Sequence, residues 1–506
     1  MCRSSRPAPL CKVTSADTHM PQTITSTRES PLTLLTSARN ATTSLSAATL
    51  ARLIRGKHLS PVEVIDAYLM QIERFNPAIN AFSHIDAEGA RAAARESEAM
   101  LMRGDAPGLL HGVPLTIKSC IDVKGFPCEA GSRLRSGYVA AQDATLVKRL
   151  RNAGAIIIGN TSIPEALVAY HTENKLQGRT CNPWDLTRTA GGSSGGEAAA
   201  IACGMSAGGI GSDGGGSIRV PASFCGIAGL KPTPGTIPGT GHYLPCAGPF
   251  SLIGVVGPMA RTVEDLQLLL EITSGYDADD PVSFPGAPSV RDRLSAECRA
   301  DKPRIGFYED DGYSPPAPEV RAAVKAAAST LAGYGFEVEP FRPDGLDRVR
   351  ELWFTIFVEA IAMVLKPMTL NREDEISDNT REFLALAAEQ PPLTGERLLH
   401  TLLERDARRA EVLAQMERFP ILLAPVCATS AFLHEDAGWG PAHSADYVRT
   451  MSYSQHYNLL GNPAATVRVG ETSEGLPIGV QIVGRPYKED EVLAVAGTLE
   501  KLTKSI

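Results

Sequence analysis

Two glycine- and serine-rich segments carry the strongest chemical signal in this chain. The first, AGGSSGGEAAA, covers residues 190–200, and the second, GSDGGGSIRVPASFCG, covers residues 211–226. Glycine at this density costs stability in strands and helices, so it indicates backbone held close to another group. Both clusters lie between apolar runs, which argues against a flexible glycine and serine linker. We therefore expect the two segments to form part of a site.

The second segment has the composition of an anion cradle. Gly214, Gly215 and Gly216 precede Ser217, and a tight turn there would aim successive backbone N–H groups at one point. The apolar run after Ser217 predicts a helix, whose N-terminus would add partial positive charge. A phosphate-binding loop requires GxxxxGK[ST] or GxGxxG after a strand, and neither pattern occurs here. The pattern therefore favours an oxyanion cradle beside a serine nucleophile.

Ser217 needs a base, because a serine hydroxyl is hardly ionised at neutral pH. The GxSxG elbow of α/β-hydrolases does not surround it, and the nearest histidines, His171 and His242, have no supporting motif. Lysine can serve if burial keeps its amine neutral. Lys118 follows the apolar run HGVPLTI, which predicts a partly buried place at the end of a strand. The competing interpretation of Lys118 is a solvated surface charge.

The segment GVPLTIKSCIDVKG (112–125), together with both glycine-rich clusters, resembles the amidase signature family of hydrolases. The resemblance starts near residue 45 and includes GPMARTVEDLQLLLE (257–271) and GLPIGVQIVGRPYKEDEVL (475–493). It implies an α/β fold with one large mixed β-sheet flanked on both faces by helices. It also implies an amidase, which hydrolyses a carboxylic amide C–N bond through an acyl-enzyme.

Carried over residue by residue, the resemblance implies a serine, cis-serine, lysine triad made of Ser217, Ser193 and Lys118. The bridging serine of the family lies 24 positions before the nucleophile, which is the separation between Ser193 and Ser217. Ser194 then becomes a supporting hydroxyl. No metal ion or cofactor is implied.

The same resemblance implies an oxyanion hole, built from the backbone N–H groups of Gly214, Gly215, Gly216 and Ser217. Asp213 and Arg219 would brace this loop. The chain also departs from the family pattern, because Ser119 stands where Asp often follows the lysine and Ser212 stands where the loop often has Thr. Both departures lie at supporting positions, where they could tune the rate or the rigidity of the loop.

Composition excludes several other classes of protein. The formal net charge of -8 argues against a nucleic-acid or anionic-membrane surface. The 10 cysteines and 10 histidines are scattered, without a CxxC pair or an HExxH motif, so we expect no metal site. The N-terminal residues lack a signal peptide's apolar core, and no apolar run of about 18 residues occurs. We expect a soluble, cytoplasmic enzyme with a small-molecule amide as substrate. A homodimer is one possible oligomeric state.

The chain's organisation predicts a disordered N-terminal tail over residues 1–45 and a single amidase-signature domain over residues 46–506. Within that domain a helical excursion is expected at about 346–419. The sequence Ser60-Pro61-Val62-Glu63 is a capping box that begins an amphipathic helix. Strands are predicted at 113–117, 155–159, 304–307, 336–341, 421–426, 465–469 and 477–484, and helices at 144–152, 318–332 and 489–502.

Substrate preference is predicted from more variable parts of the chain. The aromatic side chains of Trp353, Phe354 and Phe357, with the loop at 239–250, favour an apolar or aryl acyl group, and esters or carbamates would meet the same oxyanion hole. An ordinary core role for these aromatics competes with this interpretation. One alternative function is that of the glutamine-hydrolysing component of the glutamyl-tRNA amidotransferase, a member of the same family that works in a complex. A non-catalytic binding protein is disfavoured by the complete triad.

Overall fold

The structure is a computed structural model that describes residues 41–285, 290–295, 302–438 and 444–503. Most of the tail predicted over residues 1–45 therefore lies outside the described residues. The first described α-helix is α2 (Ala47–Arg55), and the side chain of Ser46 caps it by accepting a hydrogen bond from Thr49 N.

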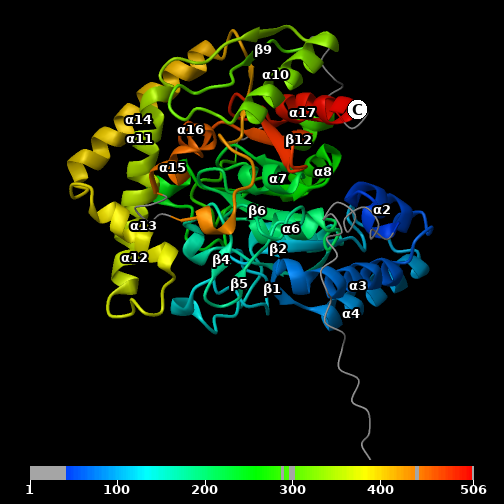
Figure 1. Ribbon diagram of the computed structural model, residues 1–506. Helices are drawn as coiled ribbons and strands as arrows, with labels where there is room; N and C mark the ends of the chain where they lie inside the picture. Colours follow the sequence, from blue (N-terminus) through cyan, green and yellow to red (C-terminus); the bar gives the residue numbers. More distant parts are fainter. Residues whose placement is uncertain (1–40, 286–289, 296–301, 439–443, 504–506) are drawn as a thin grey trace, which may run out of the picture.

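A mixed sheet of 11 strands forms the centre of the described part of the chain (Figure 1). Strands from the N-terminal and C-terminal halves of the chain share it. In spatial order the strands are β1 (Phe82–Ile85), β3 (Ile156–Thr161), β2 (Pro114–Lys118), β6 (Gly208–Asp213), β8 (Val255–Ala260), β7 (Ala228–Lys231), β12 (Ala464–Glu471), β13 (Pro477–Gly484), β11 (Ile421–Pro425), β9 (Ile305–Phe307) and β10 (Val338–Pro340). A separate two-stranded ribbon joins β4 (Glu173–Asn174) and β5 (Gly178–Arg179).

Parallel pairing occurs in two places and decides where the site lies. β2 runs parallel to β3 and to β6, whereas β6 is antiparallel to β8. β9 runs parallel to β10 and β11. Because β2 and β6 run in the same direction, their carboxyl ends meet at one edge of the sheet.

Helices cover both faces of this sheet, as the resemblance implied. Ile157 packs in one hydrophobic cluster with residues of α8, α10 and α17, while its neighbour Ile156 packs in another with residues of α3 and α6. Successive side chains of a strand point to opposite faces, so two such clusters require two covered faces. The helices are α3 (Pro61–Ile79), α4 (Ala87–Arg103), α5 (Thr145–Asn152), α6 (Gly195–Ala202), α7 (Arg219–Cys225), α8 (Val263–Thr273), α9 (Val290–Ser295), α10 (Pro318–Gly333), α11 (Leu346–Phe354), α12 (Ala360–Thr369), α13 (Asp378–Ala388), α14 (Gly395–Gln415), α15 (Ser444–Arg449), α16 (Ser452–Leu459) and α17 (Glu489–Thr503).

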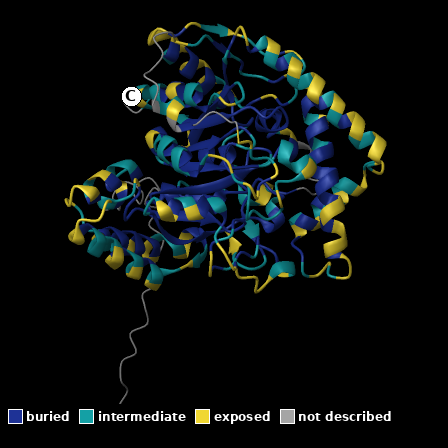
Figure 2. Cartoon of the chain, turned by 180° about the vertical axis from the view of Figure 1, so that it is seen from behind, coloured by how far each residue is buried: buried dark blue, intermediate teal, exposed yellow. Residues whose placement is uncertain are grey.

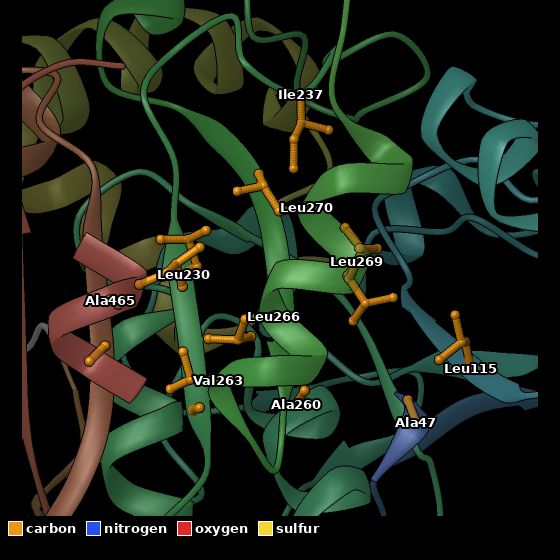
Figure 3. Close-up of a cluster of buried hydrophobic side chains, with 14 of the residues drawn as sticks. Ala47, Leu115, Leu230, Ile237, Ala260, Val263, Leu266, Leu269, Leu270 and Ala465 are labelled. Atoms are coloured by element: carbon orange, nitrogen blue, oxygen red, sulfur yellow. The ribbon is translucent and has the colours of Figure 1, made fainter. Parts of the chain in front are cut away.

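The interior of one layer shows how α8 is held. Figure 3 shows Leu266 and Leu270 of α8 on the side of the helix that faces Leu230 of β7, with Leu269 on the other side, and all four side chains are fully buried. Thr262 begins the helix, since its side chain accepts a hydrogen bond from Asp265 N. Burying one leucine side chain contributes about 2 kcal/mol, so this stripe fixes α8 on the sheet.

The predicted elements occur in the structure with ends shifted by up to two residues. Helix α3 begins at Pro61, and Ser60 Oγ accepts from Val62 N at 3.1 Å and from Glu63 N at 3.4 Å, as the capping box predicts. Strand β13 has the predicted bounds, Pro477–Gly484. Short helical turns also occur, at η1 (Thr42–Ser44), η2 (Arg133–Arg135), η3 (Glu165–Leu167), η4 (Gly248–Leu252), the π-helical η5 (Thr355–Glu359) and η6 (His434–Asp436).

The predicted helical excursion forms an arm made of α11, η5 and α12 to α14, which curves along one side of the molecule (Figure 1). In Figure 2 the outer surface of the arm is exposed, whereas all five residues of the turn η5 are buried. The segment Leu346–Thr369 is long and apolar enough to cross a membrane, although the sequence was expected to contain no such run. Of its most apolar window, 67% is buried inside the protein, as in a core helix.

Candidate active site

The ends of β2 and β6 bring the predicted residues to one edge of the sheet. Lys118 is the last residue of β2, and Asp213 is the last residue of β6. The loop from Gly214 to Ile218 follows β6 and leads into α7, which begins at Arg219 and is the helix predicted after Ser217. Thr116 of β2 pairs with Gly209 of β6, and this register fixes where the ends of the two parallel strands lie relative to each other.

The side chain of Lys118 is fully buried and has three oxygen neighbours. Its Nζ lies 2.8 Å from Ser193 Oγ. It also lies 3.0 Å from Ser212 Oγ and 3.2 Å from the carbonyl oxygen of Ser212. The competing interpretation of Lys118 as a solvated surface charge is therefore wrong.

Burial also changes the proton affinity of this amine. Loss of water around the ammonium form lowers the pKa of Lys118 to about 8, although nearby Cys120 and Asp213 act in the opposite direction. Lys118 is thus neutral in a substantial fraction of molecules near pH 8. The buried carboxyl of Glu197, which accepts a hydrogen bond from Thr161 Oγ1 at 2.8 Å, has its pKa raised to about 7 by burial.

Ser193 precedes Ser194, the N-cap residue of α6, and it both lines the cavity and contacts Lys118 Nζ. The peptide bond from Gly192 to Ser193 is cis. The next residue, Ser194, donates from its backbone N–H to the carbonyl oxygen of Ser217 at 3.2 Å, and its hydroxyl donates to the carbonyl oxygen of Ser212 at 3.3 Å. Ser194 therefore ties the first serine cluster to the glycine-rich loop.

Ser217 and the loop before it surround the head of a cavity. Ser217, Ser193 and Gly214 all line it. Gly216, the residue before Ser217, has φ +122° and is closely surrounded by other side chains. A side chain at Gly216 would be strained by this φ and would meet Ser454 at 2.7 Å. The backbone conformation of the turn and the contact with Ser454 therefore both require glycine at position 216.

One predicted oxyanion donor needs correction. Gly216 N–H donates to Asp213 Oδ1 at 2.6 Å, so this N–H group is already bonded and is not free for an oxyanion. Within the ranges that the structure describes, the N–H groups of Gly214, Gly215 and Ser217 make no such hydrogen bond. The position of the Asp213 carboxylate, which folds back over its own loop, could not be read from the sequence.

Asp213 and Arg219 form a buried ion pair that fixes the loop. Arg219 Nε and Nη2 donate to the Asp213 carboxylate at 3.0 and 3.1 Å, and neither side chain is exposed. Arg219 also donates to Gln481 Oε1 at 2.9 Å, and Asn458 Nδ2 donates to Asp213 Oδ1 at 2.9 Å. Burial alone would raise the pKa of Asp213, but the Arg219 guanidinium outweighs it and holds this pKa well below its usual value.

The cavity has an empty volume of about 550 Å³, which includes space open to solvent. Leu244, Pro245 and Phe250 line it from the loop that was expected to do so, and Phe357 and Ile361 line it from the helical arm. Trp353 and Phe354 do not line it. In the described part of the chain the lining residues are Ala166, Leu167, Ser193, Ser212, Asp213, Gly214, Ser217, His242, Leu244, Pro245, Cys246, Phe250, Ile253, Gly254, Val255, Phe357 and Ile361.

The thiol of Cys120 and the imidazole of His242 lie beside Ser212, and His242 also lines the cavity; sequence reasoning assigned neither of them a role. Cys120 Sγ lies 3.4 Å from His242 Nε2 and 3.8 Å from Ser212 Oγ. Burial would raise the pKa of Cys120, but His242 outweighs it and lowers this pKa. In the described part of the chain no group of three or more His, Cys, Asp or Glu side chains is placed to hold a metal ion.

Comparison with known proteins points to one family. The family model described as Amidase matches residues 63–493. An acylamidase from Rhodococcus erythropolis is 34% identical over 466 residues, covering 90% of this chain and 95% of the relative. A glutamyl-tRNA(Gln) amidotransferase subunit from a Picosynechococcus species is 33% identical over 488 residues, covering 90% and 97%. The solved structure of a bacterial aryl acylamidase of the amidase signature family superposes with a TM-score of 0.80 at 26% identity, covering 91% of this chain and 96% of that chain.

Proposed function

Because the chain belongs to the amidase signature family and is an amide hydrolase, we propose that it cleaves small amides with an apolar or aryl acyl group. The acyl-enzyme forms on Ser217, with Ser193 and Lys118 as the relay. One observation carries the proposal: the buried Lys118 amine lies 2.8 Å from Ser193 Oγ, and Ser193 and Ser217 line the same apolar cavity.

The proton relay follows from the groups around Lys118. A neutral amine has one lone pair and two N–H bonds, which match its three oxygen neighbours. The lone pair accepts from the hydroxyl of Ser193, while the two N–H bonds donate to the hydroxyl and the carbonyl of Ser212. When Lys118 takes the proton of Ser193, Ser193 takes that of Ser217, and the Ser217 oxygen bonds to the substrate carbonyl carbon.

The tetrahedral intermediate carries a negative charge on the former carbonyl oxygen. The N–H groups of Gly214, Gly215 and Ser217 are the donors proposed to stabilise it, each worth on the order of 3 kcal/mol. As the C–N bond breaks, the proton held by Lys118 returns through Ser193 to the leaving nitrogen, because an amide anion leaves poorly. Water then hydrolyses the acyl-enzyme by the reverse relay.

The cavity lining supports an apolar acyl group over glutamine. Glutamine carries an α-ammonium and an α-carboxylate, which need charged or strongly polar partners when they are bound. Among the described residues that line the cavity, Asp213 is the only carboxylate and is held by Arg219, and none of them is a lysine or an arginine. The walls are instead formed by aliphatic and aromatic side chains such as Leu244, Phe250 and Phe357.

A glutamine-hydrolysing component of an amidotransferase remains the second candidate, since one amidotransferase relative is 33% identical to this chain. That candidate requires a stable partner protein. We propose instead a lone enzyme, a monomer or homodimer, in the cytosol. The seven cysteines of the described ranges are all free thiols, which fits a reducing compartment.

A substrate panel tests the proposed function. Purified protein and its Ser217→Ala variant are assayed with acetyl, hexanoyl and benzoyl anilides, the matching esters and carbamates, and glutamine. We expect the larger acyl anilides to be hydrolysed with the highest kcat/KM and all activity to be lost in the variant. Release of ammonia from glutamine as the main activity, with a co-purifying partner protein, would replace this proposal with the amidotransferase.

A further inference from the structure

Two aromatic side chains hold the carbonyl groups of the glycine-rich loop. Trp353 of α11 is fully buried, and its indole Nε1 donates to the carbonyl oxygen of Gly214 at 2.8 Å. The hydroxyl of Tyr170 donates to the carbonyl oxygen of Gly215 at 3.0 Å, and it accepts from Gln455 Nε2 at 2.9 Å. Both carbonyl groups in the middle of the loop are therefore fixed from outside the loop.

These contacts also fix N–H groups. A trans peptide unit is planar, and its C=O and N–H point in opposite directions. The Gly214 carbonyl shares a peptide unit with the Gly215 N–H, so the indole of Trp353 sets the direction of that N–H. The Gly215 carbonyl shares a unit with the Gly216 N–H, so Tyr170 holds the unit whose N–H donates to Asp213.

The fit between these aromatics and the loop leaves no room for a side chain. A Cβ atom on Gly215 would lie 2.6 Å from the Trp353 ring and 2.8 Å from the Tyr170 hydroxyl. Three successive glycines have wide conformational freedom, so the loop by itself does not fix its peptide units. The restraint must come from groups outside the three glycines, and the two aromatic side chains supply it together with the Asp213 carboxylate, which accepts from the Gly216 N–H.

Trp353 also touches the wall of the cavity. Its ring stacks on that of Phe357 with centroids 4.6 Å apart and planes at 14°. Phe357 lies in the π-helical turn η5 and lines the cavity itself. Such π-bulges are frequent at functional sites. One aromatic stack therefore connects the acyl side of the cavity with the Gly214–Gly215 peptide.

We propose that Trp353 and Tyr170 are positioning residues of the oxyanion hole, and that Trp353 transmits acyl binding at Phe357 to the Gly214–Gly215 peptide. This inference rests on the proposed function. An acyl group that packs on Phe357 steadies the stack, and the steadied stack holds the Gly215 N–H in place. A well-filled cavity then raises kcat and does not only lower KM.

The test uses Trp353→Phe, which removes the N–H donor and keeps a ring to stack on Phe357. We expect kcat for the benzoyl anilide to fall about tenfold or more while KM changes less than about threefold, a smaller loss than the 10²–10³ seen for deleting a donor. The kcat advantage of benzoyl over acetyl should shrink by a similar factor. Tyr170→Phe should also lower kcat more than it changes KM, because it frees the Gly215–Gly216 peptide of the same loop, but it should affect the benzoyl and acetyl anilides alike, because Tyr170 is not part of the stack with Phe357.

A second measurement separates positioning from general damage. A trifluoromethyl ketone that adds to Ser217 is compared with the matching secondary alcohol, which cannot form the adduct. Trp353→Phe should weaken the ketone about tenfold and leave the alcohol unchanged. Trp184→Phe is the matched control, because its Nε1 also donates to a backbone carbonyl, that of Cys225 at 2.9 Å, outside the cavity lining.

The outcomes are distinct. In one outcome the wild-type enzyme forms its acyl-enzyme while folded Trp353→Phe and Tyr170→Phe keep the wild-type kcat and the wild-type affinity for the ketone. That result would overturn this inference and leave the proposed function standing. Equal loss of ketone and alcohol binding would also overturn it, because it would show a collapsed cavity. Absence of an acyl-enzyme in the wild type would instead overturn the proposed function. If Trp353→Phe does not fold, Tyr170→Phe decides the result.

Discussion

Lys118 Nζ and Ser193 Oγ lie 2.8 Å apart in a place where both side chains are almost completely buried. No carboxylate forms a salt bridge with this lysine in the described ranges, and its nearest polar neighbours are serine oxygens. An amine in such surroundings gives up its charge more readily than one in water. The account of the reaction depends on this relationship.

Activity should therefore depend on pH in one direction. Burial lowers the pKa of Lys118 to about 8, and the neutral form, which acts as the base, increases as the pH rises through this value. We expect kcat/KM for an anilide to rise about tenfold per pH unit below pH 8 and to level off above it. A profile that is flat between pH 6 and about 9 would contradict a lysine base.

Replacing the amine of Lys118 should stop the proton relay without leaving a void in the buried site. Lys118→Met keeps a long buried side chain but removes the base, and we expect kcat to fall by about 10² to 10⁴. Lys231→Met is the control, because Lys231 is also fully buried but donates to the carbonyl of Pro232 at 2.9 Å and does not line the cavity. Similar losses in the two variants would speak for a structural role of Lys118.

The ion pair behind the loop should matter for folding. Asp213→Asn leaves the Arg219 guanidinium buried without its counter-charge, and breaking such a pair costs about 3–5 kcal/mol of the free energy of unfolding. Asp66→Asn removes the partner of Arg91 in a pair whose side chains are 45% and 40% exposed, and it should cost less than about 1 kcal/mol. Urea denaturation measures both, and equal effects would refute the bracing role of Asp213.

The helical arm should set the size of the acyl group. Ile361 lines the cavity from α12, so Ile361→Trp should fill part of it and raise KM for the benzoyl anilide about tenfold, with a smaller effect on the acetyl anilide. Val364→Trp is the matched control, since Val364 is on α12 and 41% exposed. If neither variant changes the ratio of the KM values for the benzoyl and acetyl anilides, the cavity is not the site that binds the acyl group.

Much of this structure could be predicted from local sequence. Strands such as β2 and β13 are apolar runs, and Ser60 and Thr262 are helix caps, so each follows from neighbouring residues. The closeness of Lys118 and Ser193 was predicted because the family motifs identify both residues. The spatial order of the strands, with β8 between β6 and β7, depends on long-range pairing that no local pattern contains.

Side-chain direction explains what the sequence could not provide. Trp353 lies 139 positions after Gly214, and nothing near it in the sequence indicates that its N–H reaches a backbone carbonyl. The sequence predicts the Gly216 N–H as an oxyanion donor, but in the structure it donates to the Asp213 carboxylate. That carboxylate folds back over its own loop, which no sequence pattern indicates. Both cases concern hydrogen bonds between groups that are far apart in the sequence or that fold back over a loop.

The most direct test of the central claim is to find the residue that is acylated. Wild-type protein and the Ser217→Ala and Ser193→Ala variants are treated with a fluorophosphonate, and the modified peptide is identified by mass spectrometry. We expect stoichiometric labelling of Ser217 in the wild type, slower labelling of the same residue in Ser193→Ala, and none in Ser217→Ala. Undiminished labelling of Ser217→Ala, or a label on another side chain of the wild type, would contradict the account.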